Sequence, residues 1–396
     1  RWSYLPAEAI AVNRYYTSPH SGKDRGWTVQ VGHRFGSVSA LRRADNIPAA
    51  LRQIEGRPML VTEGTWVMPT KYRAEGPLTM AAYQSLTGVD AFYWFSMNYA
   101  DWTQPTLVDG FYRGAFKWTS QTPDVLGLFP GAALLFRRGD VKRSPPVLRE
   151  TRLLSDVWAA KPPAWNEEPG YDPNRDPGRW NPAAGSGNIP SLAYLVGPVQ
   201  VAYTTDPAKA KGSVADLKPW LDPRQGIVRS DTGEITLNYH RGLLQVDAPR
   251  AQGIAGFFPD GEHRVATSDI AFTVANDYAQ VLAVALDDAP LRESKKILVQ
   301  LGTIIRPTGW QTKPVTLRRR GSDTGTEGEE VTALGGAPWR IEKFSGSLSV
   351  RNPGLTRATV CDANGLPVGE APVQRNGDWF TITLPAAALY VVLRQD

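Results

Sequence analysis

A change of pattern near residue 155 limits most strongly the folds that this chain can adopt. Before it, residues 9–16, 59–63 and 89–96 are short apolar runs typical of buried strands, and residues 47–54 and 78–88 show the i, i+3, i+4 spacing of helices. Strands that alternate with helices in this way indicate parallel pairing. After about residue 190, short alternating runs separated by turn residues indicate a β-sandwich. The sequence therefore predicts an α/β part followed by an all-β part.

These two patterns divide the 396 residues into four predicted segments. Residues 1–155 form the α/β domain, and residues 156–190, which are dense in Pro and Gly, form a linker or an irregular excursion. Residues 191–337 form the β-sandwich, with a loop or hinge at 321–337. The alternating pattern restarts at about residue 338, so residues 338–396 are predicted to be a small C-terminal β-domain.

Composition and motifs exclude several classes of function. The 44 Lys and Arg residues and 39 Asp and Glu residues are scattered, so the sequence carries no nucleic-acid footprint. The four His and one Cys show no clustered metal spacing, and neither a Gly-x-Ser-x-Gly motif nor a Gly-rich phosphate loop is present. No run of 18 apolar residues exists, so no membrane span is expected. The single cysteine, Cys361, allows no internal disulfide, which fits a cytosolic protein and equally a bacterial secreted protein.

Glu63 stands where the apolar run 59–62 stops, and Gly64 then frees the backbone to turn. In a parallel barrel, residues at the carboxyl ends of strands face the active site. A carboxylate there is a candidate nucleophile or proton shuttle. The alternative is a strand-end Glu that makes a structural salt bridge.

Aromatic residues end the strands before and after Glu63. Tyr15 and Tyr16 point to opposite sides of their strand, so one faces the site and the other packs, and the pattern leaves open which. A Tyr hydroxyl beside a nucleophilic carboxylate would hold it and favour its charged form. Trp94 is either the floor under a sugar ring or a packed core residue. The predicted substrate-binding residues are Asn13, Tyr15, Tyr16, Trp66, Trp94, Asn98 and Trp102.

The order of these motifs resembles one family of retaining glycoside hydrolases. Residues 9–16, 57–63 and 75–94 are similar to strands six, seven and eight of the large (β/α)8-barrel clan with Glu at the ends of strands four and seven. Its agarase- and porphyranase-like members also carry β-sandwich domains after the barrel. The resemblance implies that residues 1–155 are the C-terminal part of a (β/α)8 TIM barrel and that Glu63 is the nucleophile. It also implies a secreted or periplasmic bacterial protein.

One departure from the family pattern matters for the mechanism. The acid/base Glu of this clan usually follows an Asn at the end of strand four, and no Asn-Glu pair occurs in the first 57 residues. Asn166-Glu167 lies in the Pro-rich stretch, after the predicted barrel units. A full barrel takes about 250 residues. We therefore expect the acid/base on an N-terminal barrel segment of the same precursor or on a second chain.

Together these features predict a glycoside hydrolase that acts on a polysaccharide or oligosaccharide by a retaining double displacement. No metal or organic cofactor is needed for this chemistry. The alternative is a non-catalytic carbohydrate-binding or structural accessory protein with a degenerate barrel, which the missing partner carboxylate favours.

Overall fold

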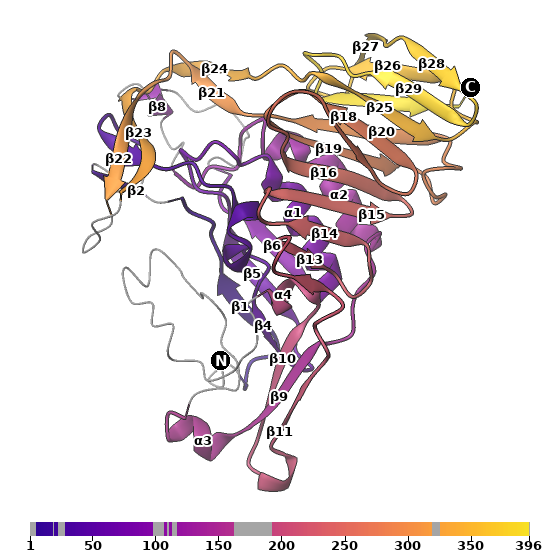
Figure 1. The fold of residues 1–396 in the computed structure, drawn as a ribbon. Coiled ribbons are helices and arrows are strands. Elements are labelled where there is room, and N and C mark those ends of the chain that lie inside the picture. The colour runs from indigo at the N-terminus through magenta and orange to yellow at the C-terminus, as the bar shows by residue number, and fades with distance from the viewer. Residues whose placement is uncertain are drawn as a thin grey trace.

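The computed structural model of the chain describes residues 5–18, 20–22, 28–97, 107–108, 111–112, 117–161, 192–318 and 325–395. Figure 1 shows two helices lying behind a large sheet, with smaller sheets below and to one side. No helix within these ranges is both long and apolar enough to cross a membrane.

Three parallel strands form the sheet that contains Glu63. Their order is β1 (Ile10–Asn13), β5 (Met59–Gly64) and β6 (Ala91–Trp94), so β5 is the central strand. Helix α1 (Glu75–Thr87) connects β5 to β6, and all thirteen of its residues are buried. Gly88 ends the helix in the left-handed conformation, with φ of 70°, which glycine adopts without steric cost. The sequence located this strand–helix–strand unit.

The prediction of a barrel portion is wrong. Strands make up 43% of the structure and helices 13%, and the described strands lie in several sheets without closing a barrel. The helix expected at 47–54 is absent from this described stretch. Short 3-10 turns η2 (Ala40–Arg42) and η3 (Ala44–Asn46) precede it, and its end forms strand β4 (Arg52–Ile54).

The false helix has a physical explanation. Ile47, Leu51 and Ile54 have helical spacing, but all three are buried, as are Ala49 and Ala50 between them. When a segment is buried on all sides, the spacing of its apolar residues does not distinguish a helix from a strand. Its conformation is set by β10, which pairs with β4 in parallel from far along the chain.

The β4 strand belongs to a second, lower sheet. The described strands of this sheet run in the order β11 (Lys211–Val214), β9 (Leu148–Leu153), β10 (Val199–Thr204) and β4. Strands β9, β10 and β4 are parallel, and β11 is antiparallel to β9. The short helix α3 (Leu154–Trp158) follows β9 at the lower end of the molecule in Figure 1. Residues 199–214 therefore join the N-terminal part of the fold rather than the predicted sandwich.

Two antiparallel sheets form the β-sandwich. In the described residues the larger has ten strands in the order β12, β13, β14, β15, β16, β19, β20, β30, β26, β27, and the smaller has five in the order β17, β18, β25, β29, β28. The larger sheet comprises Leu221–Asp222, Ile227–Arg229, Ile235–Asn238, Leu243–Ala248, Ala251–Phe257, Tyr278–Ala285, Lys296–Gly302, Tyr390–Arg394, Arg357–Cys361 and Pro367–Glu370, in that order. The smaller comprises His263–Ala266, Ile270–Val274, Gly346–Arg351, Trp379–Thr383 and Val373–Asn376.

The predicted C-terminal β-domain is part of this sandwich. Strand β25 pairs with β18, and β30 pairs with β20, so residues after 338 complete both sheets. One apolar core, which includes Ile254, Phe272, Leu348 and Val391, fills the space between the sheets. The restart of the alternating pattern at residue 338 therefore marks a return to the same two sheets.

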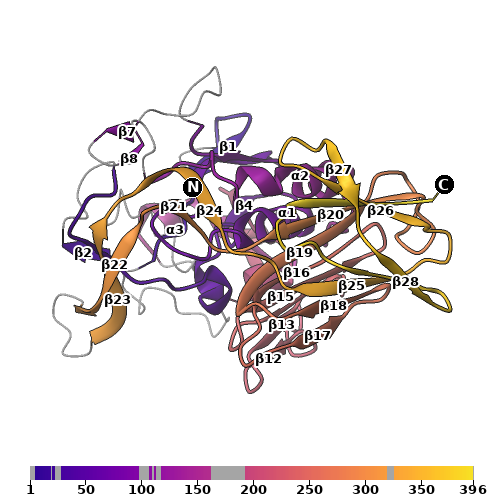
Figure 2. The same cartoon turned by 90° about the horizontal axis from the view of Figure 1, so that it is seen from above.

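A side lobe projects from the opposite side of the molecule (Figure 2). Its described strands run in the order β2 (His20–Gly22), β3 (His33–Phe35), β23 (Gly325–Ala333) and β22 (Gln311–Arg318). Strands β21 (Ile305–Thr308) and β24 (Gly336–Ile341) connect the lobe with the sandwich. Most of the described part of the predicted hinge at 321–337 is therefore strand.

Helices α1 and α2 (Phe129–Arg138) pack on the ten-stranded sheet. Gln300 of β20 accepts a hydrogen bond from the Gly131 backbone at 2.6 Å and donates one to Leu128 at 3.0 Å. The remaining described elements are β7 (Leu107–Val108), β8 (Phe111–Tyr112), η4 (Leu126–Leu128), α4 (Ala193–Val196) and η6 (Pro207–Lys209).

A chain that ends at residue 337 tests whether the C-terminal strands form a separate domain. We expect it to lose cooperative unfolding, because removal of β30 and β25 exposes the buried core between the sheets. Circular dichroism during urea titration would measure this. A truncated chain that unfolds as cooperatively as the full chain would contradict the shared sandwich.

Candidate functional site

Strand β5 is irregular at the point that carries Glu63. The pairing with β1 shifts between Val12 and Asn13, and the pairing with β6 shifts between Val61 and Gly64. Such irregularities in strand pairing change the direction of nearby side chains and are common beside active sites. Both irregularities lie at the carboxyl end of the sheet, and the Glu63 side chain there is partly exposed.

Tyr15 follows β1 and contacts Glu63 directly. Its hydroxyl donates a hydrogen bond to Oε2 of Glu63 at 2.6 Å, although Tyr15 itself is only 6% exposed. The other carboxylate oxygen, Oε1, accepts no hydrogen bond from the described part of the chain. The carboxylate is therefore held by one oxygen and open at the other.

Of the two adjacent tyrosines, Tyr15 is the one that faces the carboxylate. Tyr16 is 3% exposed, donates its hydroxyl to the Val38 carbonyl at 2.7 Å, and packs beside Trp66. The side-chain oxygen of Asn13 accepts a hydrogen bond from the Thr62 hydroxyl at 3.0 Å.

The two predicted tryptophans lie on the core side. Trp66 is fully buried, and its indole nitrogen donates to Glu75 at 3.0 Å. Trp94 is stacked on Trp66, with ring centroids 6.1 Å apart, and also contacts Phe92 and Phe129. The structure thus brings Tyr15 to Glu63 and places Trp66 in the core. The predicted residues Asn98 and Trp102 lie outside the described residues.

Two aromatic residues that the sequence analysis did not select flank Tyr15. The rings of Phe95 and Trp118 make edge contacts with it at 6.2 and 6.4 Å between centroids. Phe95 directly follows β6, so the rule that residues at the carboxyl ends of strands face the site could have selected it. Trp118 comes later in the chain, and no local pattern indicated that its segment returns to the same strand ends.

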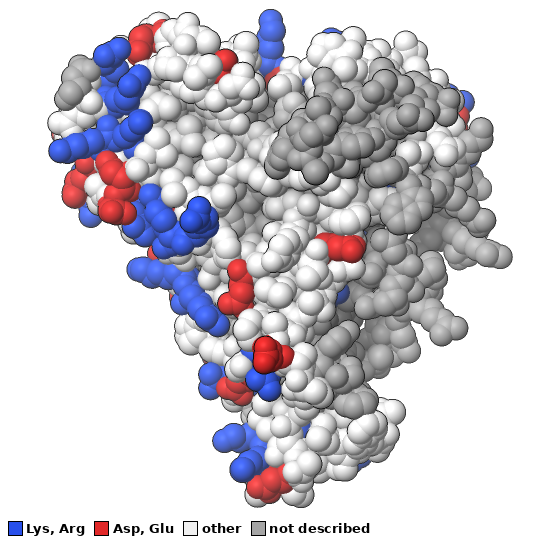
Figure 3. All heavy atoms as spheres, turned by 180° about the vertical axis from the view of Figure 1, so that it is seen from behind, with Lys and Arg blue, Asp and Glu red and all other residues white. Residues whose placement is uncertain are grey.

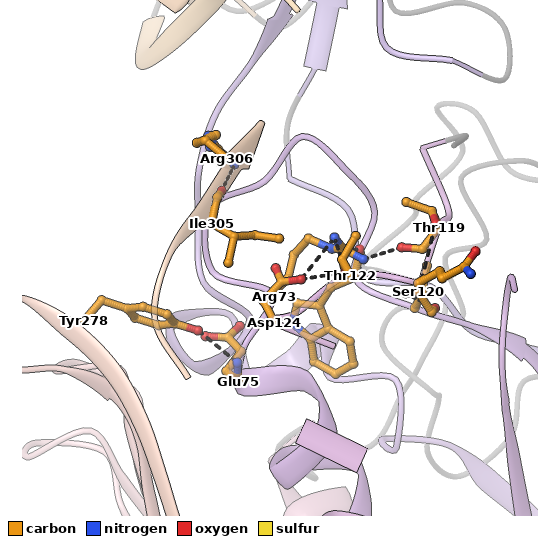
Figure 4. Close-up of polar contacts among 12 residues, drawn as sticks. Arg73, Glu75, Thr119, Ser120, Thr122, Asp124, Tyr278, Ile305 and Arg306 are labelled. Carbon is orange, nitrogen blue, oxygen red and sulfur yellow. Dashed lines mark hydrogen bonds and ion pairs between the residues drawn. The ribbon is translucent and has the colours of Figure 1, made fainter. Parts of the chain in front are cut away.

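A buried polar network supports these strand ends (Figure 4). Arg73 is 1% exposed and donates to the Trp66 carbonyl at 2.8 Å and to the Thr122 hydroxyl at 3.2 Å. It also donates to the Thr119 carbonyl and pairs with the buried carboxylate of Asp124 at 3.5 Å. Burial lowers the pKa of Arg73, and the nearby Asp124 opposes that shift.

Glu75 begins helix α1 and is also fully buried. Its carboxylate accepts hydrogen bonds from the Ser39 hydroxyl at 2.6 Å, the Ala40 backbone at 2.6 Å and the Trp66 indole at 3.0 Å. Its own backbone N–H donates to the Tyr278 hydroxyl at 2.9 Å. Burial raises the pKa of Glu75 to about 7, and the hydrogen bonds from Ser39 and Trp66 partly oppose the rise. Through these contacts, Glu75 connects helix α1 with Ser39, Trp66 and Tyr278, so its role is structural.

Basic and acidic side chains lie close together on the rear flank of the molecule (Figure 3). Elsewhere, the buried carboxylate of Asp140 pairs with Arg138 at 2.5 Å and with Arg250 at 2.9 Å. Over the described ranges, no group of three or more His, Cys, Asp or Glu side chains is placed to hold a metal ion.

No protein-family model matches this chain, and no curated protein or solved structure matches it either.

Replacing Gly64 tests the close approach of strands behind Glu63. A Cβ at this position would lie 2.3 Å from the Phe92 ring and 2.6 Å from the Arg14 carbonyl. We expect Gly64→Ala to lower the free energy of unfolding by about 1–3 kcal/mol, measured by urea titration. Gly369→Ala is the matched control, because a Cβ there meets nothing within 4 Å. Equal effects of the two substitutions would contradict the steric argument.

The pKa of Glu75 predicts a particular pH dependence. Because the carboxyl binds its proton more tightly in the folded state, with a pKa of about 7 against an ordinary value of 4.5, its contribution to stability falls as pH rises between these values. Glu75→Gln stays neutral and keeps a side chain of the same shape. Urea titrations should show the variant gaining up to about 3 kcal/mol on the wild type between pH 5 and pH 8. A difference between the two proteins that stays constant with pH would disprove this.

Proposed function

We propose that this protein is a retaining glycoside hydrolase that acts on a polysaccharide or oligosaccharide, with Glu63 as its nucleophile. The observation that supports this most is the 2.6 Å hydrogen bond from Tyr15 to Glu63, where the strands of a parallel sheet end. The order of motifs along the chain adds support. The proposal needs only these three parallel strands and no barrel.

In the proposed reaction, Oε1 of Glu63 bonds to the anomeric carbon as the bond from that carbon to the leaving oxygen breaks. A general acid gives its proton to the leaving oxygen. Water then attacks the same carbon, returns a proton to that group, and frees the Glu63 carboxylate. Retention of configuration requires this general acid to be a second carboxyl group close to Glu63.

Tyr15 has a defined part in this mechanism. Its donation to Oε2 fixes the rotation of the carboxylate and leaves Oε1 to attack. A hydrogen bond to a charged group contributes about 1.5–3 kcal/mol. The hydroxyl also stabilises the carboxylate when water releases it from the sugar.

A labelling experiment tests Glu63 without the general acid. The probes are 2,4-dinitrophenyl 2-deoxy-2-fluoroglycosides of galactose, glucose and xylose, because dinitrophenolate is a weak base that leaves unprotonated. We expect one fluorosugar on the peptide that contains Glu63, detected by mass spectrometry, and no label in Glu63→Gln. Tyr15→Phe should be labelled roughly tenfold to a hundredfold more slowly, as loss of one such hydrogen bond predicts.

Glu55→Gln is the matched control, since this exposed carboxylate precedes the opposite end of the same strand. It should be labelled like the wild type. Absence of label at Glu63 with all three probes would overturn the proposed hydrolase. If the unlabelled protein still binds polysaccharide, the non-catalytic carbohydrate-binding function is favoured instead.

A further inference from the structure

The segment 117–120 returns to the strand ends beside Glu63. The Ser96 backbone donates to the Trp118 carbonyl at 2.8 Å, and Ser120 donates to the Ser96 carbonyl at 3.0 Å. On its other side, Met68 donates to the Lys117 carbonyl at 2.7 Å. The segment is therefore hydrogen-bonded both to the residues that follow β6 and to the loop that follows β5.

Within this segment, Trp118 is the residue whose side chain reaches the surface in part. Lys117 and Thr119 on either side are buried, and Ser120 is fully buried, whereas Trp118 is partly exposed. The Trp118 ring meets Tyr15 at an interplanar angle of 69°. The partly exposed indole therefore lies beside the tyrosine that holds Glu63.

The polar network fixes the backbone of Trp118. Arg73 donates hydrogen bonds to the Thr119 carbonyl and the Thr122 hydroxyl. The hydroxyls of Thr65 and Ser120 are hydrogen-bonded to each other at 3.2 Å. Since these groups are buried, the backbone that carries the ring is fixed before any ligand arrives. A preorganised aromatic ring loses little conformational entropy when it binds.

We infer that Trp118 contacts the substrate of the Glu63 site and that the substrate presents an apolar ring face there, as a pyranose does. This inference rests on the proposed function, because it assigns the ring to the same site. Trp66 and Trp94 stack on each other on the core side of the strand ends, whereas Trp118 lies next to Tyr15. Trp118 is thus a residue that determines affinity for the sugar ring next to the nucleophile.

Affinity electrophoresis in the Glu63→Gln background tests this. The probes are agarose, porphyran, xylan and mannan cast in native gels. We expect Trp118→Ala to weaken retention by the bound glycan about tenfold in apparent dissociation constant, the size of effect that one aromatic contact gives. Trp118→Phe should keep most of it. Trp158→Ala is the matched control, because Trp158 is 66% exposed on α3, at the other end of the molecule (Figure 1). Thermal unfolding of each variant checks that the fold is intact.

The outcomes separate this inference from the proposed function. If Trp118→Ala is retained like its parent and Glu63 is still labelled by the fluoroglycoside, the role of Trp118 is overturned. The proposed hydrolase function is then still supported. Lost retention without labelling at Glu63 supports Trp118 as a binding residue and overturns the hydrolase. Failure of the Glu63→Gln parent to be retained by any of the four glycans overturns the inference about Trp118.

Discussion

The hydrogen bonds of one buried carboxylate, Glu75, hold together parts of the chain that are far apart in sequence. They join the first turn of α1 to the loop at Ser39 and to Trp66, and its backbone joins Tyr278 of the sandwich. A buried charge without partners is costly, and these donors offset that cost. The loop that follows β5 is therefore fixed from both sides, which in turn fixes the position of the Glu63 strand end.

A second buried charge, Arg73, does the same for the segment that follows β6. Its guanidinium contacts two carbonyls, one hydroxyl and one carboxylate, a fork-shaped pattern that a lysine could not reproduce. Arg73 lies in the loop between β5 and α1, two residues before Glu75, which begins the helix. This short stretch of chain thus organises both walls of the candidate site.

The sequence predicted the local unit around Glu63 because its signals are local: an apolar run, a glycine, and a helix ended by Gly88. It could not predict pairing between distant strands. Residues 52–54 became a strand through β10, and residues 357–394 returned to sheets begun before residue 302. The same limit applies to the site. Tyr15 was selected as a strand-end residue, whereas Trp118 reaches it only through tertiary contacts.

The position of β30 inside the ten-stranded sheet has a consequence for biosynthesis. This strand lies between β20 and β26, although it is the last strand described. Until residues 390–394 have been synthesised, both neighbours present open edges, which are prone to pair with other chains. The ten-stranded sheet therefore cannot be completed during translation of its earlier strands, and its open edges are exposed until residues 390–394 have left the ribosome.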